Sequence, residues 1–163
     1  PDRLRTAAQT APYSIESGTL NHAALAGVRA AVDFIASLGN GDDLRTQLLS
    51  AMAQIHQHEI ALAANLHNGL SSIKGVELIG TPVDGGERAP TLSFTLEGKT
   101  PKEVCTYLAS KNICAWAGHF YALRAVEVLG LLEKGGVTRM GMPLYNLPSE
   151  IDYTLEAVAE LAK

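Results

Sequence analysis

Hydrophobic residues recur at helical spacing through the first part of the chain. Between Asn21 and Leu38 an apolar residue falls every three or four positions, which predicts a helix with one hydrophobic side, formed by Leu25, Val28, Val32 and Ile35. Asn21 is suited to the N-cap of this helix and Gly39 to its C-terminal stop.

A second helical stripe starts near Asp42 or Asp43 and continues to about Leu66. At roughly 25 residues this helix is about twice the usual length, and a helix that long often connects two bodies. We therefore expect three regions. Residues 1–20 are an extended lead-in, residues 21–70 are a helical segment that packs on a domain outside this chain, and residues 71–163 form a small domain.

After Lys74 the pattern changes to short apolar runs. Strands are predicted over residues 76–79, 91–96 and 113–117, and a fourth begins at Val137; a Gly/Pro/Asp turn region over 81–90 separates the first two. Helices are predicted over 100–112 and 122–129 and from Pro148 onward, the first with a capping box of Thr100 and Glu103. This order predicts an α+β (α/β) fold, a small and mainly antiparallel sheet with helices on one face, preceded by two long helices.

The strand that begins at Val137 carries an arginine among apolar residues. Side chains alternate between the two faces of a strand, so Arg139 shares a face with Gly141 and Pro143, which leave room for a ligand. The opposite face is mostly apolar and suited to packing under helices. A guanidinium binds a carboxylate or phosphate through two parallel hydrogen bonds. Alternatively, Arg139 reaches water from an edge strand, a position that Pro143 also suits.

A second candidate site is the segment 118–122, which follows a predicted strand and precedes a predicted helix. It places the imidazole of His119 and the phenol of Tyr121 about 20 residues before Arg139, on the kind of loop where active-site groups concentrate.

The composition argues against several functions. The 163 residues carry a formal net charge of −4 with scattered basic residues, which gives no basis for nucleic-acid binding. No apolar run reaches the roughly 18–20 residues that span a bilayer, so we expect no membrane association. The five histidines show no metal-ligand spacing. Cys105 and Cys114 are too few for a disulfide framework, and we expect both to be buried and reduced in a cytoplasmic protein.

Several segments together resemble the C-terminal domain of class V aminotransferases, pyridoxal-phosphate (PLP) enzymes that include cysteine desulfurases. The chain is most similar to the branch described as cysteine-desulfurase-like. The matching segments occur in the family's order and cover nearly the whole chain: residues 16–21, 24–39, 88–94, 116–122 and 135–152. The start at Pro1, with neither an initiator Met nor a signal-peptide segment, also suggests a piece of a longer chain.

The resemblance implies roles for individual residues. Arg139 matches the family arginine that holds the substrate α-carboxylate, and Thr19 matches a threonine that reaches the cofactor phosphate across a homodimer. Trp116, Gly118, His119 and Tyr121 fall in the active-site loop. Asn146, Glu150 and Asp152 match a signature at the start of the last helix.

The chain also departs from the family pattern. The sulfur-transferring relatives carry a cysteine at the position of Tyr121 and an arginine at that of Trp116, so desulfuration by the usual route lacks its nucleophile here. Leu147 replaces a threonine that caps the last helix. None of the six lysines lies in the context of the Schiff-base lysine, which the family carries in its N-terminal part.

The resemblance therefore implies a domain of a PLP-dependent enzyme that acts on an amino acid. It also implies that this chain alone binds no PLP covalently and is inactive without the lysine-bearing domain. Transamination, β-elimination and desulfuration remain open as reactions. An alternative from another class is a non-catalytic binding or dimerisation module with the same fold.

Overall fold

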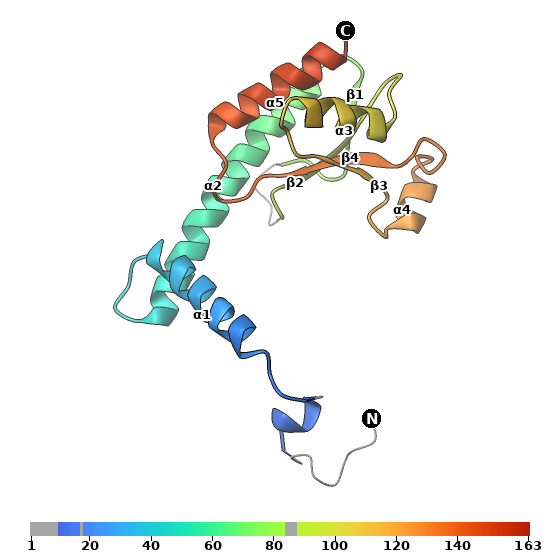
Figure 1. Ribbon diagram of the computed structural model, residues 1–163. Coiled ribbons are helices and arrows are strands. Elements are labelled where there is room, and N and C mark those ends of the chain that lie inside the picture. The colour runs from blue at the N-terminus through green and yellow to red at the C-terminus, as the bar shows by residue number, and fades with distance from the viewer. Residues whose placement is uncertain (1–9, 17, 84–87) are drawn as a thin grey trace. The chain divides into compact units, whose positions relative to one another are not determined.

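The computed structural model describes residues 10–16, 18–83 and 88–163, in two compact units divided between Met52 and Ala53 (Figure 1). The first nine residues of the predicted lead-in, Ser17 of the segment 16–21, and residues 84–87 of the predicted turn region lie outside this description. The division falls within the longest helix, α2 (Leu44–Ser72).

The first unit contains the short 3-10 helix η1 (Tyr13–Ile15), helix α1 (His22–Ser37) and the start of α2. Asn21 caps α1 as predicted, since its side-chain oxygen accepts a hydrogen bond of 3.0 Å from the Ala24 amide. Asp43 caps α2 in the same way through the Thr46 amide at 2.9 Å. The turn between the two helices requires a glycine, because a Cβ at Gly39 would overlap the backbone of α2.

Helix α2 ends at Ser72, which is beyond the end predicted near Leu66. Leu70 is fully buried, so the last turns of the helix belong to the core. Gly69 does not break the helix there, because its missing Cβ makes room for the side chain of Leu155 from the last helix. A tertiary contact therefore extends the helix past the point where its local pattern weakens.

The second unit is built on a four-stranded sheet in the order β1-β2-β4-β3. Its strands are β1 (Val76–Ile79), β2 (Thr91–Leu96), β3 (Trp116–Gly118) and β4 (Val137–Gly141). Every neighbouring pair is antiparallel, as predicted.

Helices cover one face of this sheet, also as predicted. The second half of α2, α3 (Pro101–Ser110) and α5 (Pro148–Leu161) lie on it (Figure 1). Phe94 of β2 is fully buried in the core that they form with the sheet. The strand residues of this core alternate along β2 and β4, as half-buried strands require: Leu92, Phe94, Leu96 and Met140. The capping box of Thr100 and Glu103 starts α3.

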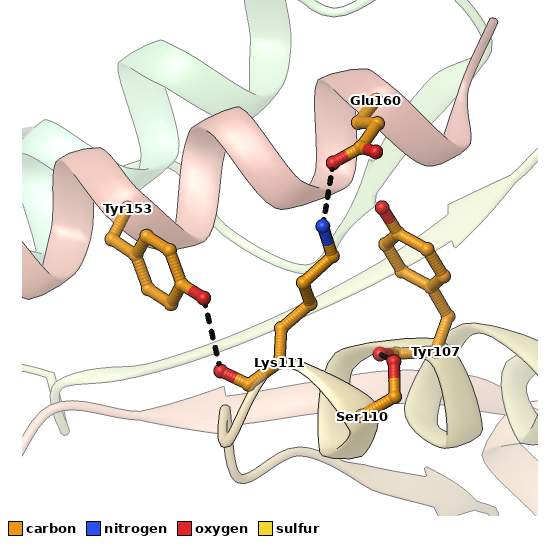
Figure 2. Close-up of polar contacts among 5 residues, drawn as sticks. All are labelled: Tyr107, Ser110, Lys111, Tyr153 and Glu160. Atoms are coloured by element: carbon orange, nitrogen blue, oxygen red, sulfur yellow. Dashed lines mark hydrogen bonds and ion pairs between the residues drawn. The ribbon is translucent and has the colours of Figure 1, made fainter.

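Polar contacts between α3 and α5 hold the helical layer together on its outer side (Figure 2). The Lys111 ammonium lies 2.9 Å from a Glu160 carboxylate oxygen, and the Tyr153 hydroxyl donates a hydrogen bond of 3.2 Å to the Lys111 carbonyl. The same ammonium lies 5.5 Å from the centre of the Tyr107 ring. These partly exposed groups link the two helices at the surface, while the hydrophobic core supplies most of the stability.

The third strand and the cysteines depart from the prediction. The strand runs from Trp116 to Gly118, not over 113–117, because pairing with β4 begins only at Trp116. Cys114 consequently lies outside the sheet and is exposed, and Cys105 is only half-buried. The apolar run before Trp116 reflects packing of Ile113 and Ala115 on the core, not strand pairing.

A smaller hydrophobic cluster lies apart from the main core. Helix α4 (Leu123–Val128), close to the predicted 122–129, contributes Val126, which packs with Leu131 and with Val137 of β4. The ring of Phe120 is part of the same cluster. This cluster anchors the segment between β3 and β4.

Candidate functional site

The face of the sheet opposite the helices carries one residue from each strand in a single row. Strand pairing sets Ile79 opposite Ser93, Ser93 opposite Arg139, and Arg139 opposite Trp116. Met140, the next residue of β4 after Arg139, is buried under the helices, so the Arg139 side chain lies on the other face and is exposed.

Arg139 reaches solvent, as in the alternative, but the edge-strand position predicted with it is wrong. Strand β4 is flanked by β2 and β3, and residue 139 pairs on both sides. The predicted proline is also outside the strand, which ends at Gly141 before Pro143. The backbone of residue 139 is therefore held by a neighbouring strand on each side.

The Arg139 guanidinium has one partner among the described residues. Its central carbon lies 3.8 Å from the centre of the Phe120 ring, well within the range of a cation–π contact. No hydrogen bond or ion pair in the described part of the chain uses its N–H groups. Because an arginine offers five donors in a planar fork, the in-plane edges are available to an anion while one flat side is stacked.

The loop that carries Phe120 has an unusual backbone. Phe120 and Tyr121 adopt left-handed φ angles of 51° and 61°, which large side chains rarely do. The Ala122 amide closes the turn by donating a hydrogen bond of 2.7 Å to the His119 carbonyl. Gly136 (φ 90°) backs the loop, since a Cβ there would overlap the Gly118 carbonyl. The fold thus holds the loop in a shape that its local sequence does not favour.

The other predicted loop residues project into solvent. Trp116 is 71% exposed, Tyr121 is fully exposed and His119 is exposed. Trp116 and Arg139 line a shallow depression of about 430 Å³ together with Thr91, Cys114, Ala115, Met140 and Gly141. Among the described residues that line it, Arg139 is the one that carries a charge, so this lining favours an anion.

Another depression, of about 350 Å³, lies between α5 and the loop after β4. Its lining includes Asn146, Glu150 and Tyr153 but no basic side chain, so it offers no comparable anion site. Thr19, the predicted phosphate ligand, lies in the first unit between η1 and α1, and it is exposed.

The predicted signature at the start of α5 forms a local hydrogen-bond network. The Glu150 carboxylate accepts hydrogen bonds from the Asn146 amide side chain at 3.0 Å and from the Leu147 backbone amide at 2.8 Å, and both bonds lower the pKa of Glu150. His58 of α2 donates from Nε2 to the Asn146 carbonyl at 3.0 Å. Leu147 gives no side-chain cap, as predicted, but Glu150 still satisfies its backbone amide. Asp152 is exposed and takes no part.

Arg88, which lies in another matching segment, has a structural role. Its guanidinium donates to the carbonyls of Thr81, Pro82 and Thr91 and thereby joins the two ends of the segment between β1 and β2. Unlike Arg139, it has its donors occupied by the backbone.

The sequence alone did not single out Phe120. The residue belongs to the segment 118–122, but nothing in its spacing indicates that a left-handed backbone turns its ring onto Arg139. Within the described ranges, no group of three or more His, Cys, Asp or Glu residues could hold a metal ion. None of the helices in those ranges is long and apolar enough to cross a membrane.

Comparison with known proteins agrees with the resemblance of the sequence. Residues 3–154 match the family model described as aminotransferase class-V. The chain is 31% identical, over 93% of its length, to a probable cysteine desulfurase of Methanothermobacter thermautotrophicus. It is 34% identical, over 98% of its length, to a probable cysteine desulfurase of Mycolicibacterium paratuberculosis.

Solved structures show the same relationship. An apo structure of a cysteine desulfurase from Thermococcus onnurineus is 25% identical and superposes with a TM-score of 0.76 over 93% of this chain. A cysteine desulfurase from Escherichia coli, at 24% identity and a TM-score of 0.73, shares the fold. The chain spans only part of these proteins: 34% and 21% of the two relatives, and 34% and 33% of the two solved chains.

Proposed function

Because this chain belongs to the class V aminotransferase family, we propose that it is the carboxylate-binding domain of a PLP-dependent enzyme that acts on an amino acid. One observation carries the proposal. Arg139 lies on an inner strand at an open depression, and among the described residues its N–H donors have no hydrogen-bond partner and no other charged group lines the depression. A bidentate pair with a carboxylate is the contact that best fits such a group.

The residues around Arg139 do not by themselves fit PLP. Covalent binding of this cofactor requires a lysine, and no lysine lines the depression. Lys111 is paired with Glu160 at the helical layer. We therefore assign to this chain the binding and orientation of the substrate carboxylate, and we assign no proton transfer to it. The lysine and the rest of the cofactor site belong, in this proposal, to another part of a longer protein.

Two further roles and a cellular location, the cytoplasm, belong to the same proposal. Thr19 reaches the cofactor phosphate across a homodimer, a role that its exposed hydroxyl permits. Trp116, Gly118, His119 and Tyr121 border the substrate, since they lie on or after the strand that pairs with Arg139. The two free cysteines suit the reducing cytoplasm.

We expect the 163-residue chain to form no specific covalent adduct with PLP. The chain would be mixed with PLP, reduced with borohydride and analysed by peptide mass spectrometry. Low, scattered labelling of exposed lysines is the expected result. Stoichiometric labelling of one lysine would show that this chain contains its own cofactor site.

We also expect the isolated chain to self-associate through α1. Leu25 and Val28 are 50% and 61% exposed, and in our proposal another domain of the longer protein covers this side of the helix. Sedimentation at increasing concentration should show oligomers, and Val28→Lys should weaken them. Asp33→Lys, an exposed substitution to the same residue on the same helix, serves as the control. A monomer at every concentration would contradict the expectation.

The alternative, a non-catalytic module with this fold, leads to a different result for the whole protein. If the complete protein carries a Schiff-base lysine and converts an amino acid, the proposal of a PLP-dependent enzyme is supported. If the complete protein carries no such lysine and still binds carboxylates at Arg139, the hypothesis of a non-catalytic binding module is supported instead.

A further inference from the structure

We infer that Phe120 is a positioning residue that holds the Arg139 guanidinium in the orientation in which it binds a carboxylate. This inference rests on the proposed carboxylate role of Arg139 and adds a second residue to that site. An arginine side chain has several rotatable bonds, and an exposed one samples many rotamers. Binding an anion then requires those rotamers to be ordered, which weakens the affinity.

The contact between the two side chains is of the kind that orders an arginine. The guanidinium carbon lies 3.8 Å from the centre of the ring, which is the distance of stacked planar groups in van der Waals contact. Stacking occupies one flat side of the guanidinium and leaves the in-plane N–H groups free. No other partner for those groups occurs among the residues that the structure describes.

The ring is itself held by the fold. Phe120 is half-buried against the cluster of Val126, Leu131 and Val137. Its left-handed φ of 51° and that of Tyr121 are uncommon for large residues, and the turn is closed by the hydrogen bond from Ala122 to His119. A backbone in a disfavoured conformation persists when surrounding contacts determine it. Here those contacts place the Phe120 ring over the Arg139 guanidinium. The inner strand holds the backbone of Arg139, and the loop holds the orientation of its guanidinium.

The contact can be tested directly in the unmodified chain. In an NMR spectrum of the ¹⁵N-labelled protein, the Nε–Hε signal of Arg139 is assigned by its loss in Arg139→Lys. A stacked ring should move this proton upfield of the corresponding signals of the exposed Arg29 and Arg124. The displacement should persist in Phe120→Tyr and disappear in Phe120→Leu. An undisplaced signal in the unmodified chain would overturn the inference before any variant is made.

The consequence for binding is tested with acetate as the carboxylate probe and chloride as the ionic-strength control. The Arg139 signal should respond to acetate, and the dissociation constant should rise about three- to tenfold in Phe120→Leu, as expected when a side chain must be ordered on binding. Phe120→Tyr keeps a ring and should stay within about twofold of the unmodified chain.

Val158→Ala is the control for general destabilisation, because Val158 is fully buried in the main core and does not belong to the cluster that holds Phe120. It should lower the unfolding midpoint but leave the acetate affinity within about twofold of the unmodified value. If Val158→Ala weakens acetate binding as much as Phe120→Leu does, general packing and not the ring matters, and the inference fails. Unchanged affinity in Phe120→Leu would also overturn it while leaving the carboxylate role of Arg139 intact. If Arg139 shows no response to acetate in the unmodified chain, the carboxylate role fails, and the positioning role fails with it.

Discussion

In the longer PLP-dependent enzyme that we propose, replacing Arg139 with alanine is expected to weaken the capture of amino-acid substrates strongly while PLP remains bound. A lost charge-assisted bidentate pair costs about 2–4 kcal/mol, which corresponds to roughly 30- to 1,000-fold in kcat/KM. Arg139→Lys should restore only part of this loss, because an ammonium group cannot reproduce the planar fork. Cofactor retention is measured by absorbance, and the kinetic loss by steady-state assay.

The decisive control for Arg139 is a substrate analogue that lacks the carboxylate. Such an analogue never uses the guanidinium, so Arg139→Ala should affect it far less than it affects the parent amino acid. Equal losses for the two compounds would mean that Arg139 supports the structure and does not bind substrate. Arg88→Ala offers a contrast, because that arginine binds backbone carbonyls and its loss should lower stability without discriminating between the two compounds.

The second large effect is expected at Gly136. Gly136→Ala introduces a Cβ that overlaps the Gly118 carbonyl, at a φ of 90° that non-glycine residues disfavour. The backbone conformation alone costs about 1–3 kcal/mol. The overlap with a backbone atom adds a loss on the order of 2 kcal/mol, since neither segment has a flexible side chain that can move aside. Urea unfolding should show the destabilisation as a lower midpoint.

Gly135 provides a closely matched control for this substitution. Its φ of 88° is almost the same, but a Cβ there would meet only Pro101, at an ordinary contact distance of 3.7 Å. Gly135→Ala should therefore lower the free energy of unfolding only by the cost of the backbone conformation. The difference between the unfolding midpoints of the two variants measures the cost of placing a Cβ against the Gly118 carbonyl. Equal midpoints for the two would show that this approach does not constrain the loop.

The features that the sequence predicted well are those determined by neighbouring residues. Asn21 and Thr100 cap their helices through contacts only three residues long, and such contacts are visible in a sequence. The buried side of β4 follows from simple alternation, which also places Arg139 on the open face. The resemblance to a known family then indicated which of the exposed groups to examine.

The features that the sequence did not predict depend on distant parts of the chain. Helix α2 continues past Leu66 because Gly69 accommodates Leu155, which lies far away in the sequence. Cys114 is exposed because pairing with β4 starts at Trp116, three residues after the predicted start of the strand at Ile113. The stacking of Phe120 on Arg139 accompanies a left-handed backbone at Phe120, whose ring packs against Val126 of α4. Short-range patterns contain none of this information.

The full exposure of Tyr121 has a consequence for which substitutions position 121 can accept. A side chain that contacts nothing within its own domain can be exchanged without penalty to the folding of that domain. Codons for tyrosine and cysteine differ by a single nucleotide, so point mutation can place or remove a thiol here while Arg139 and its sheet stay unchanged. Selection can therefore act on the chemistry of position 121 separately from the stability of the protein.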